Sequence, residues 1–166
     1  MAALPAGTKA PEFSLPALGS GGDFSLHAAL QEGPVLVAFF KVSCPVCQYT
    51  FPFLERIHQS QRDQRFTMVG ISQNNQSETA SFLKEYGVTF LTLLDDPKGY
   101  AVSNAYGLTN VPTLFLIGQD GQIEVSSVGW AKQDVEDINR KLAAVQQTAV
   151  PLIFKAGEDV RDFRAG

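Results

Sequence analysis

The chain has 166 residues, of which 45% are hydrophobic and 18% are charged, and its formal net charge is −4. This length and apolar content suit a single domain with an adequate core. The acidic balance and the lack of a basic run argue against a nucleic-acid partner. No apolar stretch approaches the roughly 18 residues that a membrane-crossing helix needs.

The amino-terminal residues Met1-Ala2-Ala3-Leu4-Pro5 show neither the charged region nor the apolar region of a signal peptide. We therefore expect a cytoplasmic location for the sequence as it stands. A periplasmic or secreted location is the alternative if a leader has been trimmed. We also expect the protein to be a monomer.

Two short segments near the amino terminus predict a β-hairpin. Residues 13–15 and 24–26 each alternate apolar and polar side chains, and a Gly19-Ser20-Gly21-Gly22 turn separates them. A short helical turn over residues 27–31 should then lead into the first core strand.

The stretch from residue 35 to residue 60 carries the most information. Residues 35–40 form a continuous apolar run of β-branched and aromatic residues, which is typical of a strand buried on both faces. Apolar residues then recur at three- and four-residue intervals, so a helix is predicted over residues 45–60, with Pro45 in its first turn. Cys44 and Cys47, the only cysteines of the chain, lie at this junction.

This placement gives the two cysteines different chemistry. Cys44 falls at the N-cap of the predicted helix, where free N–H groups and the helix dipole favour the nucleophilic thiolate. Cys47 lies one turn deeper and can attack a mixed disulfide formed at Cys44. Lys41 adds a positive charge just upstream. The pattern predicts a redox-active pair.

Three other interpretations of the pair remain open. A structural disulfide is one, although so short a loop adds little stability. A zinc site is another, but the metal takes four ligands and the chain offers only His27 and His58 beside the thiols. The third is a pair of inert buried thiols. Nothing in the sequence requires a metal or an organic cofactor.

The middle of the chain alternates strands with helices. Strands are predicted over residues 66–72 and 90–94, and helices over 77–86 and 100–106. Ser77 is the expected cap of the first helix and Gly87 ends it. We interpret Asp95-Asp96-Pro97 as a turn and a helix start rather than as an acid–base or metal site.

The last third begins with Val111-Pro112, which opens an apolar strand over residues 111–117. Proline there indicates either the start of an edge strand or a cis proline in a tight turn. Asp120-Gly121 predicts a hairpin to a strand over residues 123–128, and a helix follows over residues 132–145. Alternating strands and helices, then a hairpin and a helix, predict an α/β sandwich with a mixed sheet.

A polar tail follows the last predicted helix. We divide the chain into a domain over residues 1–147 and a tail over residues 148–166. The tail should lie on the surface and be partly ordered through its apolar residues Leu152, Ile153 and Phe154.

Taken together, the strand–Cys44-Pro45-Val46-Cys47–helix unit, Val111-Pro112-Thr113 and the Asp-Gly hairpin resemble the thioredoxin fold. The opening residues 6–15 and the stretch from Gln73 to Leu94 resemble the redoxin members, the alkyl-hydroperoxide-reductase/TlpA/ResA-like group. The resemblance covers roughly residues 5–145. It implies a three-layer α/β/α sandwich with an amino-terminal hairpin extension and a central αβ insertion.

The resemblance also implies functions for single residues. Cys44 would attack and Cys47 would resolve. Val111-Pro112 would form a cis peptide that packs on the disulfide and offers its backbone to a substrate strand, and Pro45 and Val46 would also contact the substrate. The expected partners are protein or small-molecule disulfides and thiols, and the expected activity is thiol–disulfide exchange.

The sequence departs from this group at three positions that affect proton transfer at Cys47. Ser43 replaces the usual tryptophan before the first cysteine, Thr50 replaces an acidic residue, and Ala38 replaces the buried aspartate of thioredoxin. Glu55, by helical spacing, or water is then the candidate base.

A peroxiredoxin-like peroxidase is the alternative function. Peroxiredoxins attack peroxide with the cysteine of a Pro-x-x-x-Thr-x-x-Cys motif. Aligning Cys47 with that cysteine puts Cys44 at the threonine and Phe40 at the proline, so neither position matches. In this alternative Cys47 is peroxidatic and Cys44 resolves.

Overall fold

The computed structural model describes residues 2–19, 22–61, 65–95 and 98–166. Its centre is a mixed five-stranded sheet in the order β5-β4-β3-β6-β7. Strands β3, β4 and β5 are parallel, whereas β6 runs antiparallel to both β3 and β7. The strands span Val35–Phe40 (β3), Thr67–Ser72 (β4), Leu91–Leu94 (β5), Thr113–Ile117 (β6) and Ile123–Val128 (β7).

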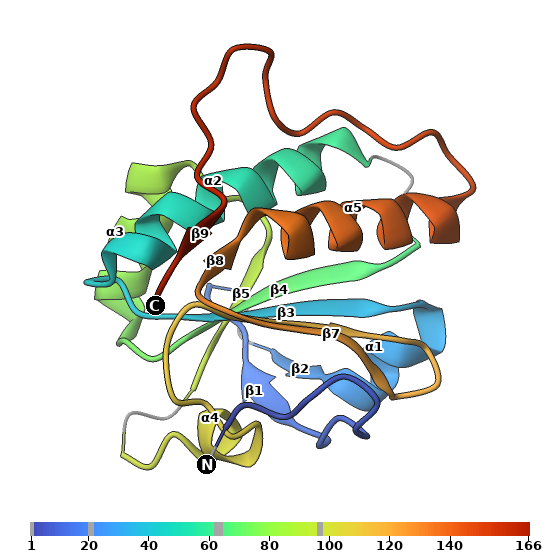
Figure 1. Ribbon diagram of the computed structural model, residues 1–166. Coiled ribbons are helices and arrows are strands. Elements are labelled where there is room, and N and C mark those ends of the chain that lie inside the picture. The colour runs from blue at the N-terminus through green and yellow to red at the C-terminus, as the bar shows by residue number, and fades with distance from the viewer. Residues whose placement is uncertain (1, 20–21, 62–64, 96–97) are drawn as a thin grey trace.

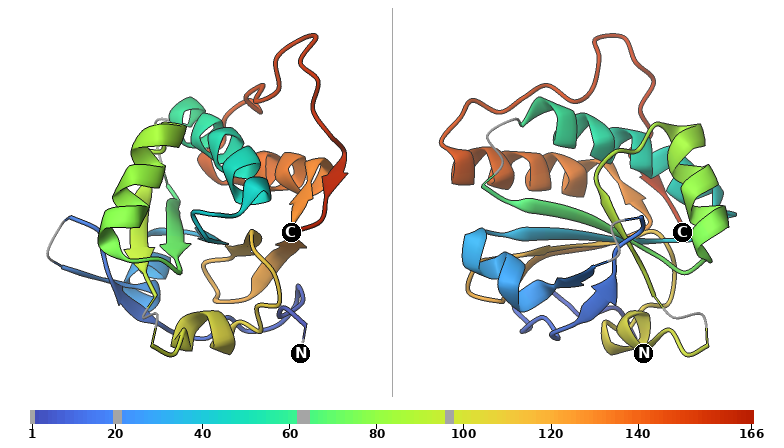
Figure 2. Two further views of the ribbon diagram at one scale, coloured as in Figure 1. Left: turned by 90° about the vertical axis from the view of Figure 1, so that its left-hand side faces the viewer. Right: turned by 180° about the vertical axis from the view of Figure 1, so that it is seen from behind.

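Helices cover both faces of this sheet, as Figures 1 and 2 show. One face carries α2 (Pro45–Ser60), α3 (Gln76–Tyr86) and α5 (Lys132–Gln146). The other carries α1 (Leu26–Glu32), α4 (Ala101–Ala105) and the hairpin of β1 (Ser14–Pro16) and β2 (Asp23–Ser25). The predicted three-layer sandwich with its hairpin extension is confirmed.

Strand β3 explains why the core has two halves. Leu36, Ala38 and Phe40 pack into the cluster under α2 and α5. Val35, Val37 and Phe39 pack into the cluster under α1 and α4. Since successive side chains of a strand point to opposite faces, a strand between two helical layers must be apolar throughout.

Most predicted elements are confirmed with small shifts at their ends. Helix α3 is capped by Asn75, whose side chain accepts a hydrogen bond from the N–H of Glu78, so the prediction that Ser77 caps it is wrong. Gly87 ends this helix in the left-handed conformation, as expected. The segment after β4 forms α3 and then β5, which extends the sheet beside β4.

The tail leaves α5 and runs along the outer side of the helical layer (Figure 1). Ile153 is buried, as expected, whereas Leu152 is 95% exposed, so its predicted anchoring role is wrong. Strand β9 (Phe163–Arg164), which was not predicted from the sequence, pairs antiparallel with β8 (Trp130–Ala131). The division of the chain at residue 147 stays a prediction.

Candidate active site

The two cysteines lie at the start of α2, just after the loop that follows β3. Cys44 is the N-cap of α2, and its Sγ accepts a hydrogen bond from the backbone N–H of Cys47 at 3.3 Å. Both are free thiols; Cys44 is half-buried, whereas Cys47 has no exposed surface. The predicted helix start, the N-cap position of Cys44 and the deeper position of Cys47 are confirmed.

The loop that presents Cys44 is held by side chains that the sequence did not single out. The N–H of Val42 donates to Oδ1 of Asn74 at 3.0 Å, and Nε2 of Gln48 donates to the carbonyl of Val42 at 2.9 Å. The N–H of Cys44 donates to the carbonyl of Lys41 at 3.3 Å. Asn74 comes from the end of β4, so only the fold reveals this contact.

The segment before β6, the strand that pairs with β3, also contacts the thiol of Cys44. The peptide Val111-Pro112 is cis, which decides between the two predicted conformations of this proline. The thiol of Cys44 donates a hydrogen bond to the carbonyl oxygen of Val111 at 3.4 Å. The site therefore unites Cys44, Cys47 and Val111-Pro112. Pro45 is exposed on the first turn of α2, but Val46 is only 8% exposed and packs into the core.

Burial separates the two thiols chemically. Burial raises the pKa of the Cys47 thiol far above its usual value, and the neighbouring Cys44 side chain adds to this effect. A backbone hydrogen bond at Lys41 opposes the shift without cancelling it. Cys47 is thus protonated at neutral pH in the reduced protein. Cys44, half-buried and facing the N–H groups of α2, is the thiol that a partner can reach.

Beside Cys44 lies a cleft of about 420 Å³, whose lining includes Lys41 and, from α4, Ser103 and Asn104. Asp95, which has only 1% of its surface exposed, holds α4 in place. Its carboxylate accepts hydrogen bonds from the N–H of Ser103 at 2.8 Å, the hydroxyl of Ser103 at 2.7 Å and the N–H of Val102 at 3.4 Å. Asp95 thus accepts hydrogen bonds from the first turn of α4 but does not itself begin that helix, whose N-cap is Tyr100; Asp96 and Pro97 lie outside the described residues.

Comparison with known proteins places this geometry in a family. The Redoxin family model matches residues 5–142. This chain is a member of the Redoxin family. It is 31% identical to the thiol-disulfide oxidoreductase ResA of Halalkalibacterium halodurans over 134 residues, 80% of this chain and 74% of the relative. It is 26% identical to ResA of Geobacillus kaustophilus over 87% of this chain and 80% of that one.

Solved structures agree with the fold. A thioredoxin-family thiol:disulfide interchange protein from Chlorobium tepidum superposes with a TM-score of 0.67 at 26% identity, covering 86% of this chain and 99% of that one. The thioredoxin domain of a thiol-disulfide oxidoreductase from Bacteroides vulgatus gives a TM-score of 0.73 at 22% identity, covering 83% and 97%. The second likeness bears on the fold alone.

This redoxin carries no carboxylate at the two positions where the resemblance places one. Thr50 is fully buried, and its hydroxyl donates to the carbonyl of Val46 at 2.7 Å. Ala38 is buried in the same core cluster as Cys47. Ser43, in the place of the usual tryptophan, is exposed.

Glu55, the expected base candidate, has a different environment. Its carboxylate accepts hydrogen bonds from the N–H of Thr89 at 2.8 Å, the hydroxyl of Thr89 at 2.6 Å and Nε2 of Gln59 at 2.7 Å. Burial acts to raise the pKa of Glu55, but these hydrogen bonds outweigh it and lower the pKa. Glu55 lies eight residues from Cys47 along α2, about 12 Å at the helical rise. It ties α2 to the segment before β5, so we correct the expectation that it serves Cys47 as a base.

Metal binding has no support in the described part of the chain. Across residues 2–19, 22–61, 65–95 and 98–166, no group of three or more histidine, cysteine, aspartate or glutamate side chains is placed to hold a metal ion. His27 lies on α1 and His58 on α2, in different layers of the sandwich. In the same ranges, no helix combines the length and the apolar character that a bilayer span requires.

Proposed function

We propose that this redoxin is a thiol–disulfide oxidoreductase in which Cys44 attacks and Cys47 resolves. The observation that carries the proposal is the asymmetry of the pair. Cys44 is half-buried at the N-cap of α2, whereas Cys47 is completely buried one turn deeper. The relatives named thiol-disulfide oxidoreductase ResA support the same activity.

The reaction begins with the thiolate of Cys44, which the N–H of Cys47 and the dipole of α2 stabilise. Its sulfur attacks one sulfur of a partner disulfide. The partner's S–S bond breaks, a mixed disulfide forms at Cys44, and the leaving thiolate takes up a proton.

Resolution then requires Cys47 to lose its proton. Water accepts it, because the positions that could hold a carboxylate are Thr50 and Ala38. The Cys47 sulfur attacks the sulfur of Cys44, the bond from Cys44 to the partner breaks, and the second partner thiolate leaves and takes up a proton. Two electrons and two protons pass to the partner, which becomes a dithiol, and the protein keeps the disulfide. Each step is reversible, so the relative reduction potentials set the direction.

The docking surface for the partner is built on Val111-Pro112 and the exposed Pro45. The carbonyl of Val111 lies 3.4 Å from Sγ of Cys44, so a chain that uses this backbone brings its own sulfur beside the nucleophile. The buried side chain of Val46 faces the core, which leaves only its backbone for this purpose.

The peroxidase alternative has less support. It needs Cys47 as the first thiol to meet peroxide, yet Cys47 has no exposed surface and burial raises its pKa. Phe40 and Cys44 also stand where the peroxidase motif has proline and threonine. We expect the reduced protein to react with hydrogen peroxide at the rate of an ordinary free thiol.

The test uses two variants and a disulfide substrate. Cys47→Ser should accumulate a mixed disulfide at residue 44 that is visible by intact-protein mass spectrometry. Cys44→Ser should form no adduct and lose exchange activity. Equal adduct formation in both variants contradicts the assigned order. Sulfenic acid appearing first on Cys47, together with a peroxide rate orders of magnitude above that of a free thiol, would favour the peroxidase.

The compartment is part of the proposal. Partner disulfides persist in oxidising compartments and are rare in the cytosol. This chemistry favours the periplasmic or secreted alternative over the cytoplasmic expectation. Rapid alkylation of cell fractions would show where the protein and its oxidised form reside.

A further inference from the structure

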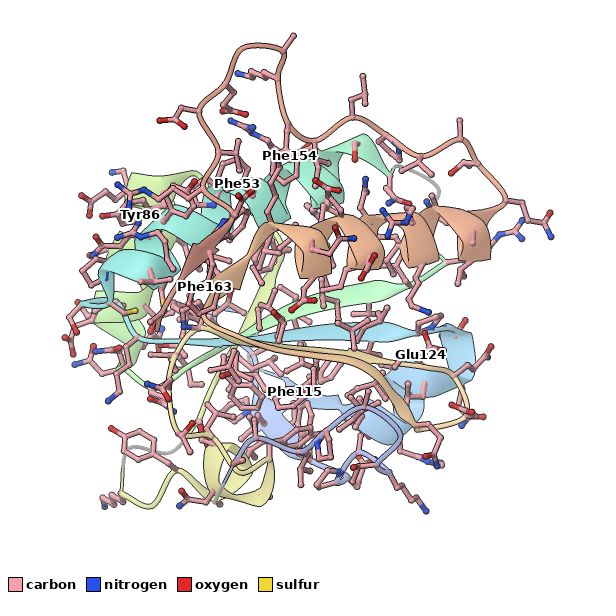
Figure 3. The ribbon with its side chains drawn as sticks, in the orientation of Figure 1. Phe53, Tyr86, Phe115, Glu124, Phe154 and Phe163 are labelled. Carbon is pink, nitrogen blue, oxygen red and sulfur yellow. The ribbon has the colours of Figure 1, made fainter. Side chains whose placement is uncertain are left out.

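The tail over residues 148–166 is fastened to the outer side of α2. Ile153 inserts into the core cluster between α2 and α5 with 5% of its surface exposed. The ring of Phe154 lies against the ring of Phe53 (Figure 3), and the two ring centroids are 5.4 Å apart. Arg56 donates two hydrogen bonds to the carboxylate of Glu158, at 2.7 and 2.8 Å, and a third to the carbonyl of Ile153 at 2.9 Å.

Beyond these anchors the tail turns toward the active site. Nε1 of Trp130 donates to the carbonyl of Arg161 at 2.6 Å, and β9 then pairs with β8. The N–H of Arg161 donates to the hydroxyl of Tyr49 at 3.0 Å, and the guanidinium of Arg164 lies 4.9 Å from the centroid of the Tyr49 ring. Tyr49 belongs to α2, two residues after Cys47, so this contact brings the tail to the first turns of the catalytic helix.

The last residue of the sequence lies against the same peptide as the attacking thiol. A Cβ added to Gly166 would meet the carbonyl oxygen of Val111 at 2.5 Å, the atom that accepts the Cys44 hydrogen bond. A Cβ added to Gly129 would meet the carbonyl oxygen of Arg164 at 2.5 Å. Both glycines thus permit a backbone-to-backbone contact, which packs residues 164–166 between Gly129 and Val111. Figure 1 shows the carboxyl end beside the first turn of α2.

A cleft remains open beside Cys44. The cleft of about 420 Å³ borders Cys44, Gly166, Lys41 and α4. It falls within the usual size of a small-molecule site, about 300–1,000 Å³. Residues 164–166 lie against Gly129 and Val111, so the broad surface of a folded protein cannot approach Cys44 across the Gly129 side.

We propose that residues 161–166 form a wall that sets the substrate class of Cys44. The wall blocks the broad surface of a folded protein on the Gly129 side and leaves the polar cleft for small disulfides. The cleft matches a small peptide disulfide that carries carboxylates, because Lys41 supplies a positive charge and the exposed side-chain amide of Asn104 supplies a hydrogen-bond donor. This inference rests on the proposed oxidoreductase function and adds the size and polarity of its substrate.

Two variants of this chain test the wall. A chain ended after Asp162 lacks residues 163–166 but keeps the bond from Trp130 to the carbonyl of Arg161. Gly166→Ala pushes the tail end off Val111 with one methyl group. Leu152→Ala is the matched control, because this side chain is in the same tail and 95% exposed. Fluorescence of Trp130, the only tryptophan, reports whether the remaining tail stays in place.

The measurement is the second-order rate at which each reduced protein is oxidised by a small and by a large disulfide, with oxidised glutathione and insulin as the probes. We expect the shortened chain to react with insulin at least ~10-fold faster than the full chain, and Gly166→Ala to show a smaller gain. The glutathione rate should change less than ~2-fold, and Leu152→Ala should change neither rate.

Different outcomes overturn different statements. An unchanged insulin rate in the shortened chain, or an equal rise with both probes, refutes the wall. The absence of any Cys44 adduct with either probe, in every variant, refutes the oxidoreductase function itself. If the shortened chain fails to fold, Gly166→Ala alone decides, since its insulin rate must still rise relative to its glutathione rate.

Discussion

Replacing Asp95 tests how the fold holds the α4 side of the active-site cleft. Its carboxylate accepts two hydrogen bonds from Ser103 and one from Val102, and its side chain is almost fully buried. In Asp95→Ala these three bonds disappear together. The hydroxyl of Ser103 keeps one partner, because Nε2 of Gln73 donates to it at 2.9 Å.

The magnitude follows from these bonds. A hydrogen bond to a charged group contributes about 1.5–3 kcal/mol, and a buried N–H left without a partner costs about 1–3 kcal/mol. The N–H of Ser103 is the group stranded, since Ser103 has only 2% of its surface exposed. Because the bonds share one carboxylate, their contributions do not add in full. We expect Asp95→Ala to lower the free energy of unfolding by about 3 kcal/mol.

Urea unfolding followed by Trp130 fluorescence measures this loss. Asp95→Asn has nearly the same shape but presents an NH₂ group toward donors, so we expect an intermediate loss of about 1–2 kcal/mol. Asp159→Ala is the control, because Asp159 is exposed, and it should change stability by less than about 0.5 kcal/mol. A loss below about 1 kcal/mol for Asp95→Ala would refute the idea that this carboxylate holds α4.

Three further predictions concern the cysteines and the tail. In the native reduced protein iodoacetamide should label Cys44 and spare Cys47 until urea unfolds the chain; mass spectrometry showing equal labelling contradicts the burial argument. Cys47→Ser should lose about 1–2 kcal/mol of stability in urea because it buries a hydroxyl, whereas Cys44→Ser should be nearly neutral. The hydrogen bonds from Arg56 lower the pKa of Glu158 from 4.5 to about 2. The contribution of Glu158 to tail docking is therefore complete above about pH 4.5 and is lost as the pH falls toward 2. Trp130 fluorescence should change over that interval in the native protein, and the same change in Glu158→Gln would disprove the assignment.

Local patterns in the sequence were enough to predict the fold class and the central Cys44-x-x-Cys47 motif. Strand β3 is predicted directly from its apolar run, because a strand between two helical layers must be apolar at every position. The start of α2 is predicted from Pro45 and the helical spacing after it, and the proposed roles of Cys44 and Cys47 rest on their separation by one helical turn. These features depend on residues that are close in the chain.

The rest depended on contacts between distant residues. Val111 lies 67 residues from Cys44, and Arg56 lies 102 residues from Glu158, so no spacing rule relates them. The helical spacing suggested Glu55 as a base for Cys47. In the fold, however, the carboxylate of Glu55 accepts hydrogen bonds from Thr89 instead.

The structure of the tail was the hardest part to predict from the sequence, for a physical reason. Its strand β9 has two residues, too few for an alternating pattern, and its pairing with β8 exists only because the tail passes over α2 first. Leu152 and Ile153 are neighbours of equal apolar character, and only the packing of α2 against α5 decides that Ile153 is buried and Leu152 exposed. The sequence alone thus determined the reactive pair and its scaffold. The three-dimensional packing decided what surrounds the pair, because backbone contacts such as that between Gly166 and Val111 leave no mark in the order of side chains.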